Sequence, residues 1–284
     1  MTRVAPRTVE AVTAVDVQTM EPVQRLRARA LMLLMRYSLD LSNLLDRVAG
    51  VGTSGNNETQ VLLALHRFGS CSRQDLLELT GMSRSGVAQL LERLSHLGLV
   101  ENFTDPHDHR MVATKLTSSG RRRVNRLNSE VDRYFHEPNP VVAELVDLLP
   151  PAGPLPTTST TPLDSLERVA DLGVRMSGPL GAVIGPSDLR QRLALAAVAE
   201  WGEARPSQLV TELGLTSGGA TYLVDGLESA GLVERLYGTV ANDRRAVVIR
   251  LSPSGQVAAE RFADVIFEHA DALAEVLAAA HGIR

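Results

Sequence analysis

Residues 69–102 read GSCSRQDLLELTGMSRSGVAQLLERLSHLGLVEN, and residues 202–235 read GEARPSQLVTELGLTSGGATYLVDGLESAGLVER. The two segments align without a gap, and ten of their 34 positions are identical, including a shared GLVE. After two extra residues in the second copy, the match continues to Gly120 and Gly255. A repeat displaced by 133 residues is a duplicated domain, because solenoid units recur every ~20 to 50 residues. The sequence therefore predicts two tandem domains of one fold.

The length agrees with two domains, and the net charge excludes a positive electrostatic potential over the whole protein. The chain has 284 residues, more than the ~100 to 200 residues of a typical domain, and a formal net charge of -4. Residues 1–150 carry 18 Lys and Arg against 17 Asp and Glu, whereas the rest of the chain carries 11 against 16. Any binding to nucleic acid must therefore be local, and the two copies are electrostatically unequal.

The sequence also favours a cytoplasmic protein without a membrane partner. A single cysteine, Cys71, excludes an intrachain disulfide and fits a reducing compartment. No apolar run reaches the ~20 residues that span a bilayer, and residues 1–20 lack the apolar core of a secretory signal.

Periodicity divides the chain into four parts: a mobile N-terminal arm over 1–20, a first domain over 21–149, a Pro/Thr/Ser-rich linker over 150–163 and a second domain over 164–284. In the first domain we expect helices over 22–48, 58–68, 72–80, 83–97 and from 118 to 149, the last broken near Pro138 and Pro140, and strands over 99–104 and 111–117. In the second domain we expect helices over 165–176, 187–201, 206–213, 216–230 and 253–280, and strands over 232–237 and 246–252. The first of these helices is expected to be interrupted by Gly178, Pro179 and Gly181.

The helix expected over 83–97 separates apolar from polar positions. Val87, Leu90, Leu91 and Leu94 form one stripe at helical spacing, so Ser85, Gln89 and Glu92 project from the other side with Arg84 and Arg93 on the flanks. A short helix, a tight turn, this helix and then a hairpin make a winged helix-turn-helix, in which the second helix can enter a major groove.

The motifs that follow carry a family resemblance. ERLSHLGLV and DHRMVATKLTSSG in copy one, and DGLESAGLV and DRRAVVIRLSPSG in copy two, resemble the recognition helix and wing of the multiple-antibiotic-resistance regulator (MarR) family. The resemblance implies a mainly α fold with small β-hairpin wings: two tandem winged helix-turn-helix domains flanked by long dimerisation-type helices.

The resemblance also implies a function. Members of this family are DNA-binding transcription regulators, and they form homodimers through their first and last helices. A similar chain would be a sequence-specific regulator of double-stranded DNA, a repressor, in which the two copies form a covalent pseudo-dimer or the chains form a homodimer. A small-molecule effector is a possible further partner, and no cofactor is implied.

The candidate DNA-binding residues lie on the second helix of each helix-turn-helix and on each wing. In copy one they are Ser83, Arg84, Ser85, Gln89, Arg93, His109 and Arg110. In copy two they are Thr216, Ser217, Thr221, Tyr222, Arg244 and Arg245. The helix of copy two carries no basic residue, so we expect an asymmetric DNA site that copy one dominates.

Several features have plainer interpretations. Asp108 and Asp243 can as readily form ion pairs with Arg110 and Arg245 within a wing as take part in a DNA contact, whereas the adjacent basic residues are expected to face DNA. The basic run 121–123 is more typical of a solvated helix face than of a phosphate clamp.

Redox, metal and catalytic functions have little support. Cys71 is interpreted as a plain thiol in the turn before the short helix, and the run 107–109, HDH, is too small a ligand set for a metal site. No phosphate-binding loop, nucleophile elbow or zinc-protease motif is present, so we expect no enzyme. The alternative function is a winged-helix scaffold that binds a protein partner such as the transcription machinery.

Overall fold

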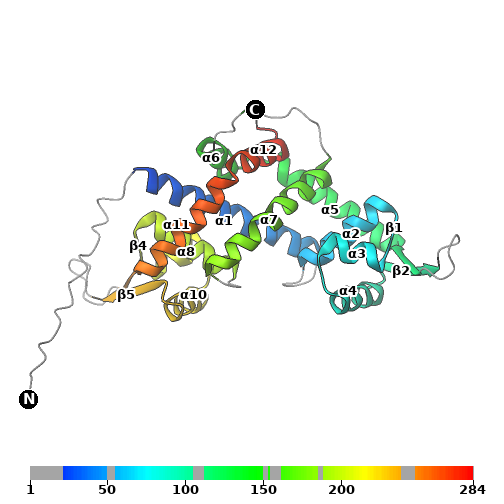
Figure 1. The fold of residues 1–284 in the computed structure, drawn as a ribbon, viewed down its shortest axis with the longest axis horizontal. Helices are drawn as coiled ribbons and strands as arrows, with labels where there is room; N and C mark the ends of the chain where they lie inside the picture. Colours follow the sequence, from blue (N-terminus) through cyan, green and yellow to red (C-terminus); the bar gives the residue numbers. More distant parts are fainter. Residues whose placement is uncertain are drawn as a thin grey trace, which may run out of the picture. The chain divides into compact units, whose positions relative to one another are not determined.

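The computed structural model describes residues 22–49, 55–104, 112–149, 153, 161–184, 188–237 and 247–283 (Figure 1). The expected arm over 1–20 and most of the expected linker lie outside the described residues. Within the described part, no helix is long and apolar enough to cross a membrane.

The described residues are mainly helical with small antiparallel strands, as predicted, and the two copies repeat one order of elements. Copy one comprises α1 (Pro22–Ala49), α2 (Gly55–Phe68), β1 (Ser70–Ser72), α3 (Arg73–Thr80), α4 (Arg84–His96), β2 (Val100–Thr104), β3 (Val112–Leu116), α5 (Ser118–His136) and α6 (Pro140–Leu148). Copy two comprises α7 (Pro162–Ile184), α8 (Leu189–Trp201), β4 (Glu203–Ala204), α9 (Pro206–Glu212), α10 (Ser217–Ser229), β5 (Val233–Tyr237), β6 (Val247–Leu251), α11 (Pro253–Glu268) and α12 (Ala270–His281).

Local signals in the sequence explain where the second helix of each helix-turn-helix begins and ends. The hydroxyl groups of Ser83 and Thr216 each accept a hydrogen bond, at 3.1 Å, from the backbone N–H three residues later, so each caps its helix. Gly98 and Gly231 follow the helix ends with φ of 66° and 71°, a left-handed conformation that favours glycine.

Each copy contains a three-stranded sheet, where the sequence predicted only a hairpin. The strand orders are β1-β3-β2 and β4-β6-β5, and every pairing is antiparallel. The extra strand, β1 or β4, has only three or two residues, which is too short for an alternating pattern to reveal it. It pairs with β3 or β6 and thereby fixes the entry of the helix-turn-helix against the wing.

A glycine in each copy lets the helix after the wing approach the backbone closely. A Cβ atom on Gly120 would overlap the Leu99 carbonyl oxygen, and one on Gly255 would overlap the Leu232 carbonyl oxygen. The glycine of each L-T/S-x-x-G segment is therefore required by packing.

The chain divides into two compact units whose limits do not follow the repeat. Unit 1 contains residues up to Arg29 and residues 194–260, and thus the helix-turn-helix and sheet of copy two. Unit 2 contains residues 30–193 and 261–284. In unit 2, α7 of copy two packs against α5, and α12 packs against α5, α6 and α7 (Figure 1), so the flanking helices of both copies share one core.

A buried aromatic cluster lies within that core. The ring of His281, on α12, lies 5.7 Å from the Tyr37 ring on α1, 5.7 Å from the Tyr134 ring and 5.1 Å from the Phe135 ring on α5. Burial lowers the pKa of His281 to about 4, because no charge nearby compensates the loss of hydration. His281 is therefore a neutral member of the packing between α12 of copy two and the helices of copy one.

Two expectations about helices were wrong. The backbone of α7 remains helical to Ile184 through Pro179, because proline removes one hydrogen bond of the ladder without preventing helical geometry. The helix expected over 253–280 is divided into α11 and α12 at His269, whose backbone N–H donates to the Ile266 carbonyl oxygen and whose ring contacts the Val265 carbonyl oxygen. No proline or glycine marks this break in the sequence.

Candidate nucleic-acid interface

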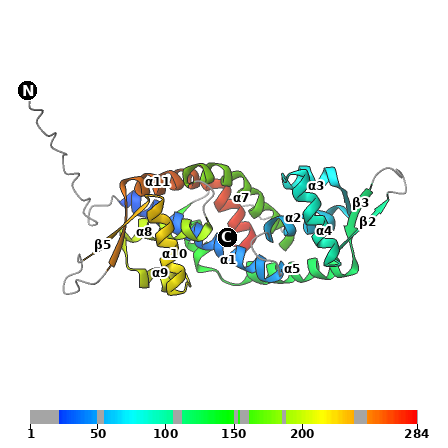
Figure 2. The same cartoon turned by 90° about the horizontal axis from the view of Figure 1, so that it is seen from below.

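The helix-turn-helix of copy one is formed by α3 and α4, which lie beside β2 and β3 (Figure 2). Ser72 and Asp75 form a capping box at the start of α3, with Ser72 N–H donating to the Asp75 carboxylate at 2.7 Å. Gly81 ends α3 in a left-handed conformation, and Ser83 starts α4 two residues later. The turn between the two helices is therefore fixed by local hydrogen bonds.

The outer face of α4 is polar and exposed, as the sequence predicted. Val87, Leu90, Leu91 and Leu94 are buried, whereas Arg84, Ser85, Gln89 and Glu92 are exposed. The Ser85 hydroxyl lies 3.1 Å from that of Ser83, so both remain near the start of the helix. This end of α4 combines a guanidinium group, hydroxyl groups and an amide, which can hydrogen-bond to phosphates and base edges.

Arg93 has a partner that sequence reasoning missed. Its Nη2 atom lies 3.5 Å from Oε2 of Glu58, a fully buried residue on α2, and its side chain is only 39% exposed. Burial raises the pKa of Glu58, although Arg93 and Arg123 of α5 oppose that shift. The structure therefore places Arg93 in a contact between α4 and α2, rather than beside Arg84 on the exposed face.

Alignment of the two copies contains a sequence signal for the contact between Glu58 and Arg93. Glu58, Arg93 and Arg123 align with Gln191, Gly226 and Ala258, so copy two lacks all three charges at once. A carboxylate and two guanidinium groups that disappear together suggest that they depend on one another.

The basic run at the start of α5 is largely occupied by local contacts. Arg121 donates to the Leu116 carbonyl oxygen at 3.0 Å and to the Ser118 hydroxyl at 3.3 Å. Arg122 donates to the Ser119 hydroxyl at 2.8 Å. These contacts agree with the interpretation as a helix face and not with a shared phosphate clamp.

The corresponding helix of copy two, α10, presents a different surface. The Tyr222 side chain is 73% exposed, whereas the Thr221 hydroxyl donates to the Ser217 carbonyl oxygen of its own helix at 3.0 Å. Further along α10, Asp225 and Glu228 both form ion pairs with Arg235 of β5. The α10 face thus carries two carboxylates and no cation of its own.

Some predicted residues lie outside the described residues. They are the wing-tip residues His109, Arg110, Arg244 and Arg245, together with the His107–His109 run. In the part of the chain that the structure describes, no three His, Cys, Asp or Glu side chains are grouped as metal ligands would be. Cys71 lies in β1 rather than in a turn, and burial, followed by Asp75, raises the pKa of its thiol.

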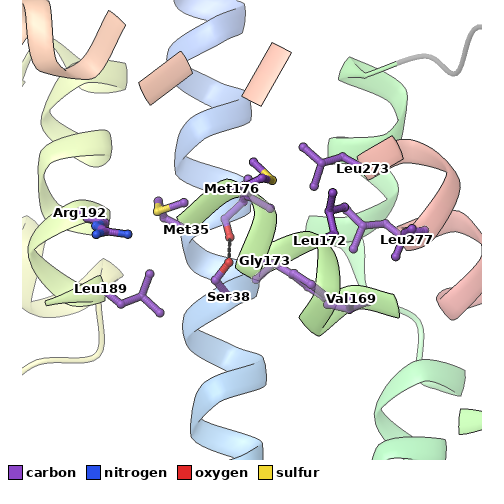
Figure 3. A pocket seen from close by; sticks show the side chains of 13 residues that line it. Met35, Ser38, Val169, Leu172, Gly173, Met176, Leu189, Arg192, Leu273 and Leu277 are labelled. Carbon is purple, nitrogen blue, oxygen red and sulfur yellow. Dashed lines mark hydrogen bonds between the residues drawn. The ribbon is translucent and has the colours of Figure 1, made fainter. Parts of the chain in front are cut away.

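Unit 2 also contains a cavity of about 170 Å³ between α1, α7, α8 and α12 (Figure 3). Most of its lining is apolar, for example Leu172 and Leu277, and Ser38 and Arg192 add polar groups. The Arg192 guanidinium lies 5.8 Å from the centre of the Phe262 ring, and burial lowers the pKa of Arg192. An apolar cavity with a guanidinium group on its wall suits a small molecule that bears an acidic group.

Comparison with known proteins identifies a family and several proteins with similar sequences. The MarR family model matches the chain twice, over residues 51–111 and 185–246. The uncharacterized HTH-type transcriptional regulator YdgJ of Bacillus subtilis is 27% identical over 78 residues, which are 28% of this chain and 48% of that protein. The chain thus spans about half the length of this curated relative.

Two solved structures illustrate the similarity further. One, described as the mechanism for regulation of DNA binding of Bordetella bronchiseptica BpsR by 6-hydroxynicotinic acid, is 27% identical with a TM-score of 0.31, covering 41% of this chain and 85% of that chain. Another, a mutant MarR from E. coli complexed with operator DNA, is 23% identical with a TM-score of 0.29, covering 38% of this chain and 76% of that chain.

Proposed function

We propose that this chain, whose residues 51–111 and 185–246 match the MarR family model, is a transcription regulator of that family that binds double-stranded DNA mainly through copy one. The observation that carries the proposal is the exposed start of α4, where Arg84, Ser85 and Gln89 lie opposite a buried apolar stripe. A helix-turn-helix with such a face can place it in a major groove. A chain bound over a promoter would exclude polymerase, and on this ground we propose repression.

The proposed DNA site is asymmetric. Phosphates attract Arg84, which is exposed, whereas α10 has no cation of its own and its Asp225 and Glu228 already pair with Arg235. Copy two would therefore add contacts to the DNA backbone, together with the exposed ring of Tyr222 on α10. The wing residues Arg244 and Arg245 remain proposed contacts.

The two copies are proposed to act as an intrachain pseudo-dimer. Support comes from unit 2, in which α5 and α6 of copy one pack against α7 or α12 of copy two. In a family dimer such contacts join two chains, whereas here both sets of helices belong to one chain.

A salt titration tests the DNA-binding function. A pool of genomic duplex fragments is titrated with the intact chain at several salt concentrations, because each phosphate contact adds ~0.9 to the slope of log affinity against log salt. We expect a steep slope for the natural chain, and Arg84→Ala should reduce both the affinity and the slope. A flat response, or no binding, would instead favour the scaffold that binds a protein partner.

The cavity supports a small-molecule effector as part of the proposal. Its apolar lining and Arg192 fit an aromatic or aliphatic carboxylic acid of modest size. Addition of benzoate should raise the thermal unfolding midpoint of the natural chain, and Arg192→Gln should reduce that rise. Equal midpoints with and without a panel of such acids would remove this part of the proposal.

A further inference from the structure

Two ion pairs join copy one to copy two, and each lies inside one compact unit. In unit 1, Arg29 on α1 donates to the Glu200 carboxylate on α8 at 2.8 Å. In unit 2, Arg67 on α2 donates to the Glu167 carboxylate on α7 at 2.7 Å. Each pair therefore connects the first helix of one copy to the second helix of the other.

The two pairs occupy equivalent positions with opposite charge. Arg67 and Glu200 are the same position of the repeat, because both lie two residues before the glycine that opens the aligned segments. Arg29 and Glu167 face that position from the first helix of the other copy. Copy one thus supplies arginine at both places, and copy two supplies glutamate at both places.

This reversal changes which pairings of copies are favourable. When copy one meets copy two, each contact joins a guanidinium group to a carboxylate. If copy one met another copy one, Arg29 would face Arg67, and if copy two met another copy two, Glu167 would face Glu200. Like charges at such close range are repelled and select against those pairings.

We propose that Arg29, Arg67, Glu167 and Glu200 form a charge-reversed contact set that makes copy two, and not a second copy one, the partner of copy one. The proposal rests on the pseudo-dimer arrangement of the proposed function. It explains why copy one does not pair with copy one of a second chain.

Burial makes the contact near Glu200 the more sensitive of the two to reversal of one charge. The Glu200 side chain is 16% exposed, and that of Arg29 is 35% exposed, so water screens this pair incompletely. The Glu167 side chain is 26% exposed, but that of Arg67 is 61% exposed. Reversal of the charge at Arg29 or at Glu200 would place two like charges together where water screens them only in part.

A charge exchange in the full chain tests the proposal without changing net charge. The double variant Arg67→Glu with Glu200→Arg makes both intrachain contacts repulsive and both like-copy contacts attractive. The fourfold variant, which adds Arg29→Glu and Glu167→Arg, restores attraction between the two copies with every sign reversed. Exchange of the wing pair, Lys115→Glu with Glu101→Lys, is the matched control, because that pair lies within copy one at 3.3 Å.

The readouts are the thermal unfolding midpoint and the mass from light scattering over a range of protein concentrations. The double variant should disfavour the intrachain pairing by roughly tenfold or more, so its midpoint should fall. The tether keeps the two copies at an effective concentration on the order of mM, so its mass should rise toward two chains only as protein concentration approaches that range. The fourfold variant and the wing control should behave like the natural chain.

The proposal fails if the double variant keeps the midpoint and mass of the natural chain, or if the fourfold variant does not recover both. A lower midpoint with a mass that stays at one chain even at protein concentrations on the order of mM would also overturn it, because the charges would then stabilise the fold without choosing the partner. None of these readouts involves DNA, so a failure of DNA binding by the natural chain would count against the proposed function alone.

Discussion

Copy one and copy two share a scaffold but differ in the basic residues of the second helix of the helix-turn-helix, where Arg84 and Arg93 align with Ser217 and Gly226. Both keep the helix cap at Ser83 or Thr216 and the buried apolar stripe of the second helix. By contrast, Arg84 is replaced by Ser217, and the contact of Glu58 with Arg93 has no counterpart. The comparison teaches that caps, glycines and apolar spacing specify a winged helix, whereas a few charged positions decide whether it can read DNA.

The largest expected effect tests whether both copies require glycine where the helix after the wing approaches the backbone. Gly120→Ala and Gly255→Ala should each lower the free energy of unfolding by more than ~4 kcal/mol, because the new Cβ overlaps a backbone carbonyl oxygen. Urea unfolding measures the loss. Gly218→Ala is the control, since a Cβ there meets no atom within 4 Å, and it should be neutral or slightly stabilising. A loss in one copy only would show that the shared scaffold is not required in both.

A second prediction concerns the packing of α12 against copy one. Because the folded pKa of His281 is about 4, below the ordinary value of 6.5, the unfolded chain takes up this proton first as pH falls. The stability that neutral His281 provides is complete above pH 6.5 and is lost progressively as pH falls toward 4, by roughly 3 kcal/mol over the window.

Urea unfolding at pH 7.5 and pH 5 of the natural chain and His281→Phe measures this loss. The phenylalanine ring fits the aromatic cluster but cannot take up a proton, so its stability should fall less between the two pH values. If both proteins lose the same stability, His281 does not titrate as its buried position requires.

The smallest expected effect tests whether Arg93 belongs to the exposed polar face of α4 that is proposed to contact DNA. Glu58→Gln and Glu92→Gln each remove one carboxylate, but Glu58 is buried against Arg93 and Glu92 is exposed on α4. We expect Glu58→Gln to weaken DNA binding about threefold to tenfold by releasing Arg93 and loosening α4, whereas Glu92→Gln should strengthen it slightly. The fold should tolerate glutamine at residue 58, because copy two has Gln191 there.

Mobility-shift titrations against one DNA fragment, selected by the natural chain, measure both variants. An increase of affinity in Glu58→Gln would mean that Arg93, once released, contacts DNA directly. That result would support Arg93 as a DNA-binding residue, as the sequence predicts.

The repeat itself made the fold predictable from sequence. Gly98 and Gly231, the caps and the apolar stripe each appear twice, so the helix-turn-helix and the hairpin were predicted in both copies. Two features escaped because their signals are weak: β1 and β4 are too short for an alternating pattern, and the break at His269 has no proline or glycine.

The candidate site was only partly predictable. The exposure of Arg84, Ser85 and Gln89 follows from helical periodicity, which requires no tertiary information. The position of Arg93 depends on Glu58, which lies 35 residues earlier in the chain and meets Arg93 only through tertiary packing. Alignment of the two copies, in which both charges are lost together, was the one sequence signal for that contact.

The most direct test of the central claim is the base preference of the intact chain, obtained by selecting bound duplexes from a random-sequence pool. If copy one reads the DNA, the selected sequences will share one strongly specified half-site, without a second half-site of comparable base preference. A palindrome with two equally specified half-sites would contradict the account, because α10 would then read bases as well as α4 does.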